Sequence, residues 1–198
     1  MRRAHLWGTA TLTGLSLVLA TAAVSSAQTG TPTVYKVTIQ SVAFSQNDNG
    51  TDGFVTVSSS SLELDIASAA AGVTLGNYIS GVSLGVGSYK RMQIVVSCTF
   101  KLKGQLTSAG TTYWTTAGGT ASSLTASDAA PAEGSFTLPT PPCSGGTVTG
   151  TSPSGAISFD ITPNTTVTAI ASFDVTNAMQ LTGGNLVPGS PSMSFSIQ

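Results

Sequence analysis

The chain has 198 residues, of which 8% are charged, and its formal net charge is −1 at pH 7. Charged residues usually make up about a quarter of a globular domain. So low a charge density excludes electrostatic binding to nucleic acid or to an anionic membrane as the main function. The solvated surface must instead be formed mainly by Ser, Thr, Asn and Gly, a composition that suits an exported β-protein.

The N-terminus has the pattern of a secretory leader. A pair of arginines follows the first methionine, residues 6–23 are uncharged and largely apolar, and Ala27 ends a run of small residues. These are the three regions that direct export and cleavage. We therefore predict a signal peptide over residues 1–27 and a single mature domain over residues 28–198. The mature protein is expected in the periplasm, at the cell surface or secreted, without a stable membrane span; a retained membrane anchor is the alternative.

The predicted cleavage removes the one histidine of the chain, His5. A Ser-His-Asp or Cys-His relay needs an imidazole to shuttle protons. Most zinc and copper sites need histidine or several thiolates. These chemistries are therefore excluded for the mature chain. Five basic residues then stand against eight acidic ones, which gives a net charge of −3.

Alternation of apolar and polar residues predicts strands from the start of the mature chain. The alternating run over residues 35–39 changes phase before Val42 and Phe44. One extra residue near Gln40 and Ser41 restores the alternation, so we predict a β-bulge there. The same pattern predicts further strands over residues 62–66, 157–161, 167–175 and 193–197.

An oxygen-rich turn, residues 47–53, follows the first strand. Asp48 and Asp52 supply the carboxylates that Ca²⁺ prefers, although Gly50 occupies a ligand position of the EF-hand pattern and no distal glutamate follows. Hairpin turns also favour Asn-Gly and Asp-Gly pairs, for reasons of backbone conformation. The turn is therefore interpreted first as a hairpin connection and second as a Ca²⁺ site.

Two acidic residues, Glu63 and Asp65, alternate along one strand face. Carboxylate pairs catalyse glycoside hydrolysis. A solvated outer face explains two acidic residues at this spacing more simply. A carboxylate-based hydrolase that also draws on Asp160 or Asp174 is therefore a remote hypothesis, and we predict a protein that is not an enzyme.

The clearest strand pattern covers residues 92–103. Its apolar face is formed by Met92, Ile94, Val96, Cys98, Phe100 and Leu102. The second cysteine is Cys143, and an even pair in an exported protein predicts a disulfide. A bond between Cys98 and Cys143 closes a loop of about 45 residues, which is worth roughly 4 kcal/mol in the chain-entropy model.

A region rich in Gly, Ser, Thr, Ala and Pro, about residues 104–155, is interpreted as an insertion of hairpins and loops. It contains Tyr113 and Trp114, and Trp114 is the one tryptophan of the predicted mature chain. Exposed aromatic rings can stack on sugars while nearby hydroxyls form hydrogen bonds. Anchoring of the insertion to the core is the alternative. Adjacent side chains of a strand point to opposite faces, so each aromatic can take one role.

Short strands separated by Gly, Pro, Asn and Asp predict an all-β domain, specifically a β-sandwich. Matching motifs occur in order over residues 37–42, 54–57, 62–66 and 87–94, and again over 173–175 and 186–188. With these motifs, residues 34–102 resemble an uncharacterised family of bacterial exported domains. The resemblance implies a transthyretin-like (prealbumin-like) β-sandwich and no activity. The fold prediction is therefore a Greek-key β-sandwich, transthyretin-like or immunoglobulin-like.

The leading hypothesis is a non-catalytic module with a structural or adhesive role at the cell surface or in the secreted matrix. The alternative is a carbohydrate-binding module that uses Tyr113 and Trp114. The expected partners are extracellular glycans or other surface proteins, with no nucleic acid. Apart from the Ca²⁺ alternative at Asp48 and Asp52, no cofactor is expected, and the oligomeric state is left open.

Overall fold

The computed structural model describes residues 28–50, 52–68, 84–138, 142–153, 157–164 and 169–197. The predicted signal peptide lies outside these residues. Antiparallel strands make up nearly all the regular structure, with one short 3-10 turn, Ala126–Asp128. The all-β prediction is therefore confirmed. No helix within the described residues is long and apolar enough to cross a membrane.

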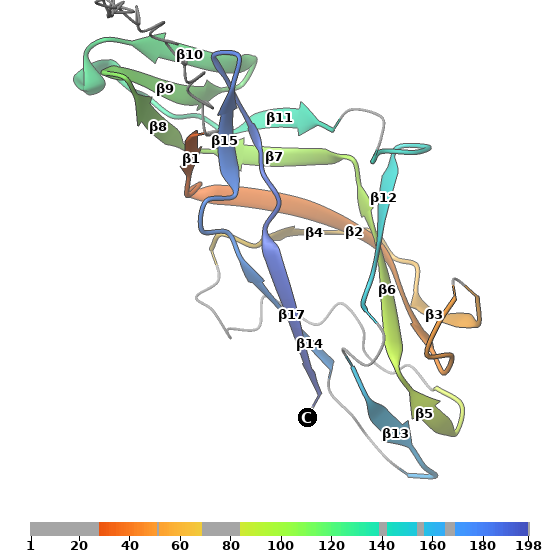
Figure 1. Ribbon diagram of the computed structural model, residues 1–198. Helices are drawn as coiled ribbons and strands as arrows, with labels where there is room; N and C mark the ends of the chain where they lie inside the picture. Colours follow the sequence, from red (N-terminus) through yellow and green to blue (C-terminus); the bar gives the residue numbers. More distant parts are fainter. Residues whose placement is uncertain are drawn as a thin grey trace, which may run out of the picture.

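A seven-stranded antiparallel sheet forms the main layer (Figure 1). Its strands are β2 (Val34–Ser45), β3 (Phe54–Ser58), β4 (Leu62–Asp65), β6 (Arg91–Ser97), β7 (Thr99–Lys103), β11 (Gly134–Thr137) and β12 (Thr147–Thr151). The central strand, β2, pairs with β4 and β3 on one side and with β7 and β6 on the other. β11 and β12 pair with the far side of β7 and β6.

Alternation along β2 turns its apolar side chains inward, and a bulge preserves this orientation. The buried residues are Tyr35, Val37, Ile39, Val42, Ala43, Phe44 and Ser45. The register between β2 and β6 shifts between Ile39 and Ser41, which confirms the predicted bulge. A second shift, between Val42 and Ala43, occurs in the pairing with β3. Without the extra residue, Val42 and Phe44 would turn to solvent, because a one-residue slip exchanges the two faces of a strand.

The long strand predicted over residues 92–103 is present as β6 and β7, with Cys98 at their junction. Its apolar face is buried at Met92, Ile94, Cys98, Phe100 and Leu102. Cys98 forms a disulfide with Cys143, at a Cα–Cα distance of 5.8 Å, and both residues are buried. The predicted disulfide is thus confirmed.

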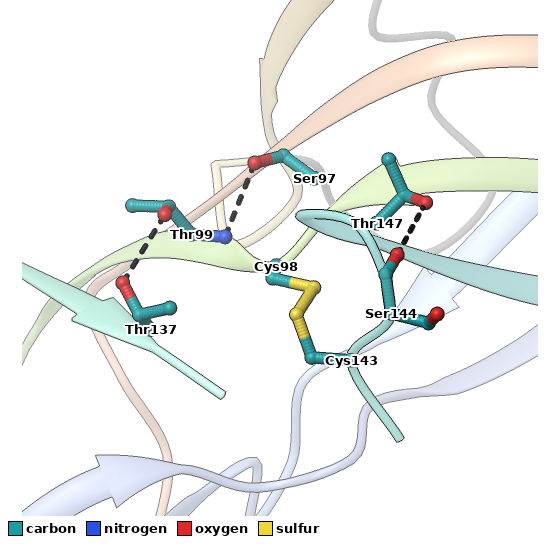
Figure 2. The surroundings of a disulfide bond; sticks show 7 residues. All are labelled: Ser97, Cys98, Thr99, Thr137, Cys143, Ser144 and Thr147. Carbon is teal, nitrogen blue, oxygen red and sulfur yellow. Dashed lines mark hydrogen bonds between the residues drawn. A yellow bond between two sulfur atoms is a disulfide. The ribbon is translucent and has the colours of Figure 1, made fainter. Parts of the chain in front are cut away.

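β11 and β12 behave as one edge strand that is interrupted beside Cys98 (Figure 2). The N–H of Leu138, just after β11, donates to the Cys98 carbonyl at 3.0 Å. The N–H of Cys98 donates to the Gly146 carbonyl, just before β12, at 2.9 Å. Cys143 lies between the two edge strands in the sequence, and its disulfide fastens the described residues before β12 to Cys98 at the interruption.

A long C-terminal hairpin crosses the main sheet as part of a second layer (Figure 1). Its strands are β14 (Ala169–Asp174), β15 (Met179–Thr182), β16 (Asn185–Pro188) and β17 (Ser192–Ile197). β14 pairs with β17, and β15 pairs with β16. Gly183 and Gly184 have φ values of 57° and 81°, as a type I′ two-residue turn requires. The first strand, β1 (Gln28–Gly30), adds to the free side of β15.

The hydrophobic core lies between the main sheet and these strands. Met179 and Leu186 of the hairpin are fully buried in it. A small sheet of β5 (Gly87–Tyr89) and β13 (Phe159–Ile161) adds Tyr89 and Phe159, whose rings stack at 5.4 Å. The hydroxyl of Tyr35 on β2 donates to the Gly189 carbonyl of the hairpin at 2.8 Å. This layered arrangement is consistent with the predicted β-sandwich.

The hairpins predicted within residues 104–155 form a three-stranded sheet of β8 (Gln105–Ser108), β9 (Thr111–Thr116) and β10 (Gly119–Ser123). The backbone N–H of Leu186 on β16 donates to the hydroxyl of Thr120 on β10 at 2.8 Å. β8 contacts β1, and β9 contacts β7 and β16. The same region also contains β11 and β12, so part of the sequence that looked like an insertion completes the main sheet.

Removal of the disulfide is expected to weaken the sheet edge most strongly. For a sequence separation of 45 residues, the Cys98→Ala/Cys143→Ala variant should lose about 4 kcal/mol of unfolding free energy. Amide exchange should rise most in β12, whose start is held beside the disulfide. Denaturant unfolding and hydrogen exchange measure both effects, with the reduced parent protein as a reference. A uniform rise in exchange over β2 and β12 would contradict this account.

Tyr35 is expected to make the protein sensitive to alkaline pH. Burial raises the pKa of Tyr35 above its ordinary value of 10.0. Its contribution to stability is therefore complete below that ordinary value and falls as the pH rises above it, because the ionised ring favours the unfolded chain. Phenolate absorbance of the parent protein, minus that of Tyr35→Phe, should show Tyr35 ionising together with unfolding. Because Tyr35→Phe also lacks the hydrogen bond to Gly189, its unfolding free energy at neutral pH should be about 1 kcal/mol lower than that of the parent protein. Ionisation of Tyr35 while the protein is still folded would contradict the prediction.

Candidate functional site

The aromatic pair lies on β9, the central strand of the β8–β9–β10 sheet. Tyr113 is partly buried and packs against the hydrophobic core, as does its cross-strand neighbour Leu106. Because adjacent side chains of a strand point to opposite faces, Trp114 points away from the core. Trp114 is half-buried. The two aromatics therefore have different roles: Tyr113 anchors the sheet, and Trp114 belongs to its outer face.

The outer face around Trp114 is called the Trp114 face here. Register places on it Gln105, Thr107, Thr112, Trp114, Thr116, Ala121 and Ser123. Gln105 and Ala121 flank Trp114 from the two neighbouring strands, and directly opposed residues share a face. Gln105 and Thr107 are exposed. Thr112 is buried, 2% exposed, so its hydroxyl is not presented to solvent. The Trp114 face therefore presents one indole ring, one amide and the hydroxyls of Thr107, Thr116 and Ser123, and none of its side chains is charged.

Two further contacts define the margin of this face. The hydroxyl oxygens of Thr107 and Thr112 lie 3.0 Å apart, which forms a cross-strand hydrogen bond. The hydroxyl of Ser123 donates to a carboxylate oxygen of Asp128 at 2.7 Å. Asp128 belongs to the 3-10 turn that follows β10, so its negative charge contacts the face at Ser123, the residue at the end of β10.

Backbone turns and one buried hydroxyl hold β9 in position. Ala109 and Gly110, between β8 and β9, have φ values of 47° and 81°, the conformation of a type I′ hairpin turn. Thr115 is fully buried, and its hydroxyl donates to the Ala132 carbonyl at 2.7 Å. The N–H of Gly104 donates to the same hydroxyl at 3.1 Å. These bonds connect the strand that carries Trp114 to β7 and to the segment before β11.

The oxygen-rich turn connects β2 to β3 and is built by its own hydrogen bonds. Asp48 and Asp52 are both exposed. The amide of Asn47 donates to a carboxylate oxygen of Asp52 at 3.4 Å, and the hydroxyl of Ser45 donates to the Asp52 carbonyl at 3.3 Å. Gly53 has a φ of 69°, a value that glycine adopts without strain. These features support the interpretation of residues 47–53 as a hairpin connection.

Arg91 holds this turn from the neighbouring strand. Its guanidinium donates to the Gly50 carbonyl and lies 5.6 Å from the centre of the Phe54 ring. Ser45 pairs with Arg91 on one side and Phe54 on the other, so the two larger side chains meet above it. A fixed positive charge at the turn opposes the binding of a second cation. Within the described residues, no group of three or more His, Cys, Asp or Glu side chains could hold a metal ion. Ca²⁺ binding at Asp48 and Asp52 stays a prediction.

The four carboxylates named for hydrolysis are each engaged in local contacts. Glu63 forms an ion pair with a lysine of β7 at 2.8 Å. Asp65 accepts the backbone N–H groups of Tyr35 at 3.0 Å and Ala67 at 3.2 Å. Asp160 accepts a hydrogen bond from a serine of β5. Hydrogen bonds from the side chain and backbone two residues later lower the pKa of Asp174. These contacts explain all four carboxylates as parts of the fold, and we do not propose the hydrolase.

No protein-family model, curated protein or solved structure matches the chain. The resemblance to exported bacterial domains stays a prediction.

Sequence reasoning did not single out Gln105, Ala121 or Arg91. Gly110 and Gly118 mark the two hairpin turns, so counting outward from them pairs Trp114 with Gln105 and Ala121. The contact of Arg91 has no such local signal, because Gly50 lies 41 positions earlier in the chain.

Replacement of Arg91 is expected to loosen the turn. The Arg91→Ala variant loses a cation–π contact worth about 0.5–1 kcal/mol and a hydrogen bond of similar size. The unfolding free energy should therefore fall by about 1 to 2 kcal/mol, and amide exchange in residues 47–53 should rise. Lys90→Ala removes the same charge from the adjacent position and serves as the control. An equal loss in both variants would show that net charge, and not the contact, is responsible.

Proposed function

We propose that the protein is an exported, non-catalytic β-domain with a structural or adhesive role at the cell surface or in the secreted matrix. The observation that carries the proposal is that two ion pairs, Lys36–Glu133 and Lys101–Glu63, link separate segments of the main sheet. A domain of this kind presents a durable neutral surface instead of a reactive centre. The predicted leader over residues 1–27 supports its export.

Ion pairs connect separate strands across the main sheet. Lys36 on β2 lies 2.7 Å from Glu133, just before β11, and its hydrogen bond with that carboxylate raises the pKa of Lys36. Lys101 on β7 lies 2.8 Å from Glu63 on β4. Pairs as exposed as these add little stability one by one. Their value for the proposal is that they neutralise the charges and leave hydroxyls and amides to face the surroundings.

The disulfide supports a location outside the cytoplasm. Cys98 and Cys143 are 1% and 7% exposed, and disulfides persist in oxidising compartments outside the cytoplasm. The bond fastens an edge of the main sheet, where fraying would otherwise begin. A module that must last outside the cell gains most from stabilisation at that place.

The proposal is tested by locating the full chain, expressed with its own leader, and by measuring adhesion. We expect the exported fraction to hold a protein that begins at Gln28 and has no reactive thiol. Beads coated with this protein should be retained on the cells that produce it more than beads coated with a neutral protein of similar size. Retention in the cytoplasm would overturn the proposed location. Export without retention on cells or matrix would overturn the adhesive role.

A further inference from the structure

We infer that the Trp114 face binds a neutral glycan, with the indole of Trp114 stacked on a sugar ring. The inference rests on the proposed adhesive function, because it names the class of partner that an adhesive surface of this protein would contact. It uses Trp114 alone of the aromatic pair, since Tyr113 is packed against the core.

The position of Trp114 suits a stacking platform. It lies on the central strand of its sheet, so both sides of the ring have neighbours of known identity. Ala121, the neighbour on one side, has a short side chain that does not project past the indole. Gln105, the neighbour on the other side, is exposed. A sugar that stacks on the indole thus meets an amide next to the ring. The apolar face of the ring contacts the indole, and its hydroxyls reach the polar groups around it.

The absence of charged side chains on the Trp114 face indicates the chemistry of the ligand. Acidic polysaccharides and phosphorylated ligands are recognised through Arg and Lys, and neither residue is among the seven of this face. Thr107, Gln105 and their neighbours offer both donors and acceptors. That set matches uncharged hydroxyl groups, so a neutral sugar chain fits the face better than an anionic one.

The indole is held before any ligand arrives. Trp114 is half-buried, and the buried hydroxyl of Thr115 anchors its strand to the Ala132 carbonyl. A side chain that is already ordered loses little conformational freedom on binding, which favours affinity. One aromatic ring can therefore give measurable binding here.

The surroundings of the sheet leave room for a polymer. β8, β9 and β10 lie at the opposite end of the molecule from the C-terminus (Figure 1). A Cβ atom added at Gly110, Gly118 or Gly119 would meet no other atom within 4 Å, so both hairpin turns border open space. This open space lies at the two ends of β9, the strand that carries Trp114.

A protein partner is the weaker explanation of the same face. A stable protein interface takes about 20–30 residues on each side, whereas the Trp114 face comprises the seven residues named above around one aromatic ring. The most exposed large hydrophobic side chain nearby is Leu124, 82% exposed, just after β10. Leu124 therefore provides the control for non-specific hydrophobic contact.

The test measures binding of the exported protein to soluble polysaccharides by titration calorimetry and tryptophan emission. The probes are hydroxyethylcellulose, laminarin and galactomannan, with anionic alginate as the charged comparison. We expect saturable binding to a neutral probe, no binding to alginate, and an affinity about thirtyfold lower in Trp114→Ala, the size typical of a central aromatic contact. Gln105→Ala should bind several-fold more weakly, and Leu124→Ser should bind like the parent protein.

Folding of each variant is checked by circular dichroism and thermal unfolding, and Trp114→Leu, which also lacks an aromatic ring, replaces Trp114→Ala if the latter does not fold. Parent-like binding by a folded Trp114 variant, or no binding of any neutral probe, would overturn the inference. If the glycan inference fails in this way and beads coated with folded Trp114→Ala still adhere to cells like the parent, adhesion uses another surface, such as a protein contact, and the proposed adhesive role stands. If the parent binds a glycan but its beads do not adhere, the glycan site stands and the adhesive role fails.

Discussion

The arrangement of the main sheet depends on the bonds made by one residue, Cys98. Its carbonyl holds the end of β11, its N–H holds the start of β12, and its sulfur holds Cys143 in the segment between. The same residue lies where β6 meets β7, within the strand whose apolar face closes the core. A slip of one residue there would turn that apolar face to solvent. The register of β6 and β7 around Cys98 therefore fixes the pairing of the edge strands, the burial of the apolar face and the position of the disulfide.

Hydrogen bonds from neutral hydroxyl groups connect separate sheets and segments of the molecule. The hydroxyl of Tyr35 reaches the Gly189 carbonyl, the hydroxyl of Thr120 accepts from Leu186, and the hydroxyl of Thr115 donates to Ala132. A buried hydroxyl that is hydrogen-bonded fixes geometry without the desolvation cost of a buried charge. The scarcity of charge in the composition thus has a structural counterpart, and it leaves the outer face of the β8–β9–β10 sheet equally neutral.

The strands, the bulge and the disulfide could be predicted because each has a local pattern. The alternation of apolar and polar residues over 35–44 and 92–103 indicates which side chains face inward, and a change in its phase indicates an extra residue in the strand. The sequence does not predict β11 and β12 as strands of the main sheet, because Gly134–Thr137 and Thr147–Thr151 contain few aliphatic residues. As edge strands they are held by backbone hydrogen bonds to β7 and β6, which any residue except proline can form. Composition therefore made them resemble a loop insertion.

For the candidate site, the sequence by itself determined the chemistry: no histidine after the predicted cleavage, little charge, and a tyrosine and a tryptophan at adjacent positions, which a strand must turn to opposite faces. The tertiary structure decided which of them faces outward. Tyr113 packs on the core, so Trp114 is left with Gln105 and Ala121 beside it. It also decided that Arg91 bonds to the turn that looked like a cation site. The reason is physical: alternation is a property of one strand, whereas the neighbours of a side chain depend on which strands pair, and that is settled only when the sheets pack around a common core.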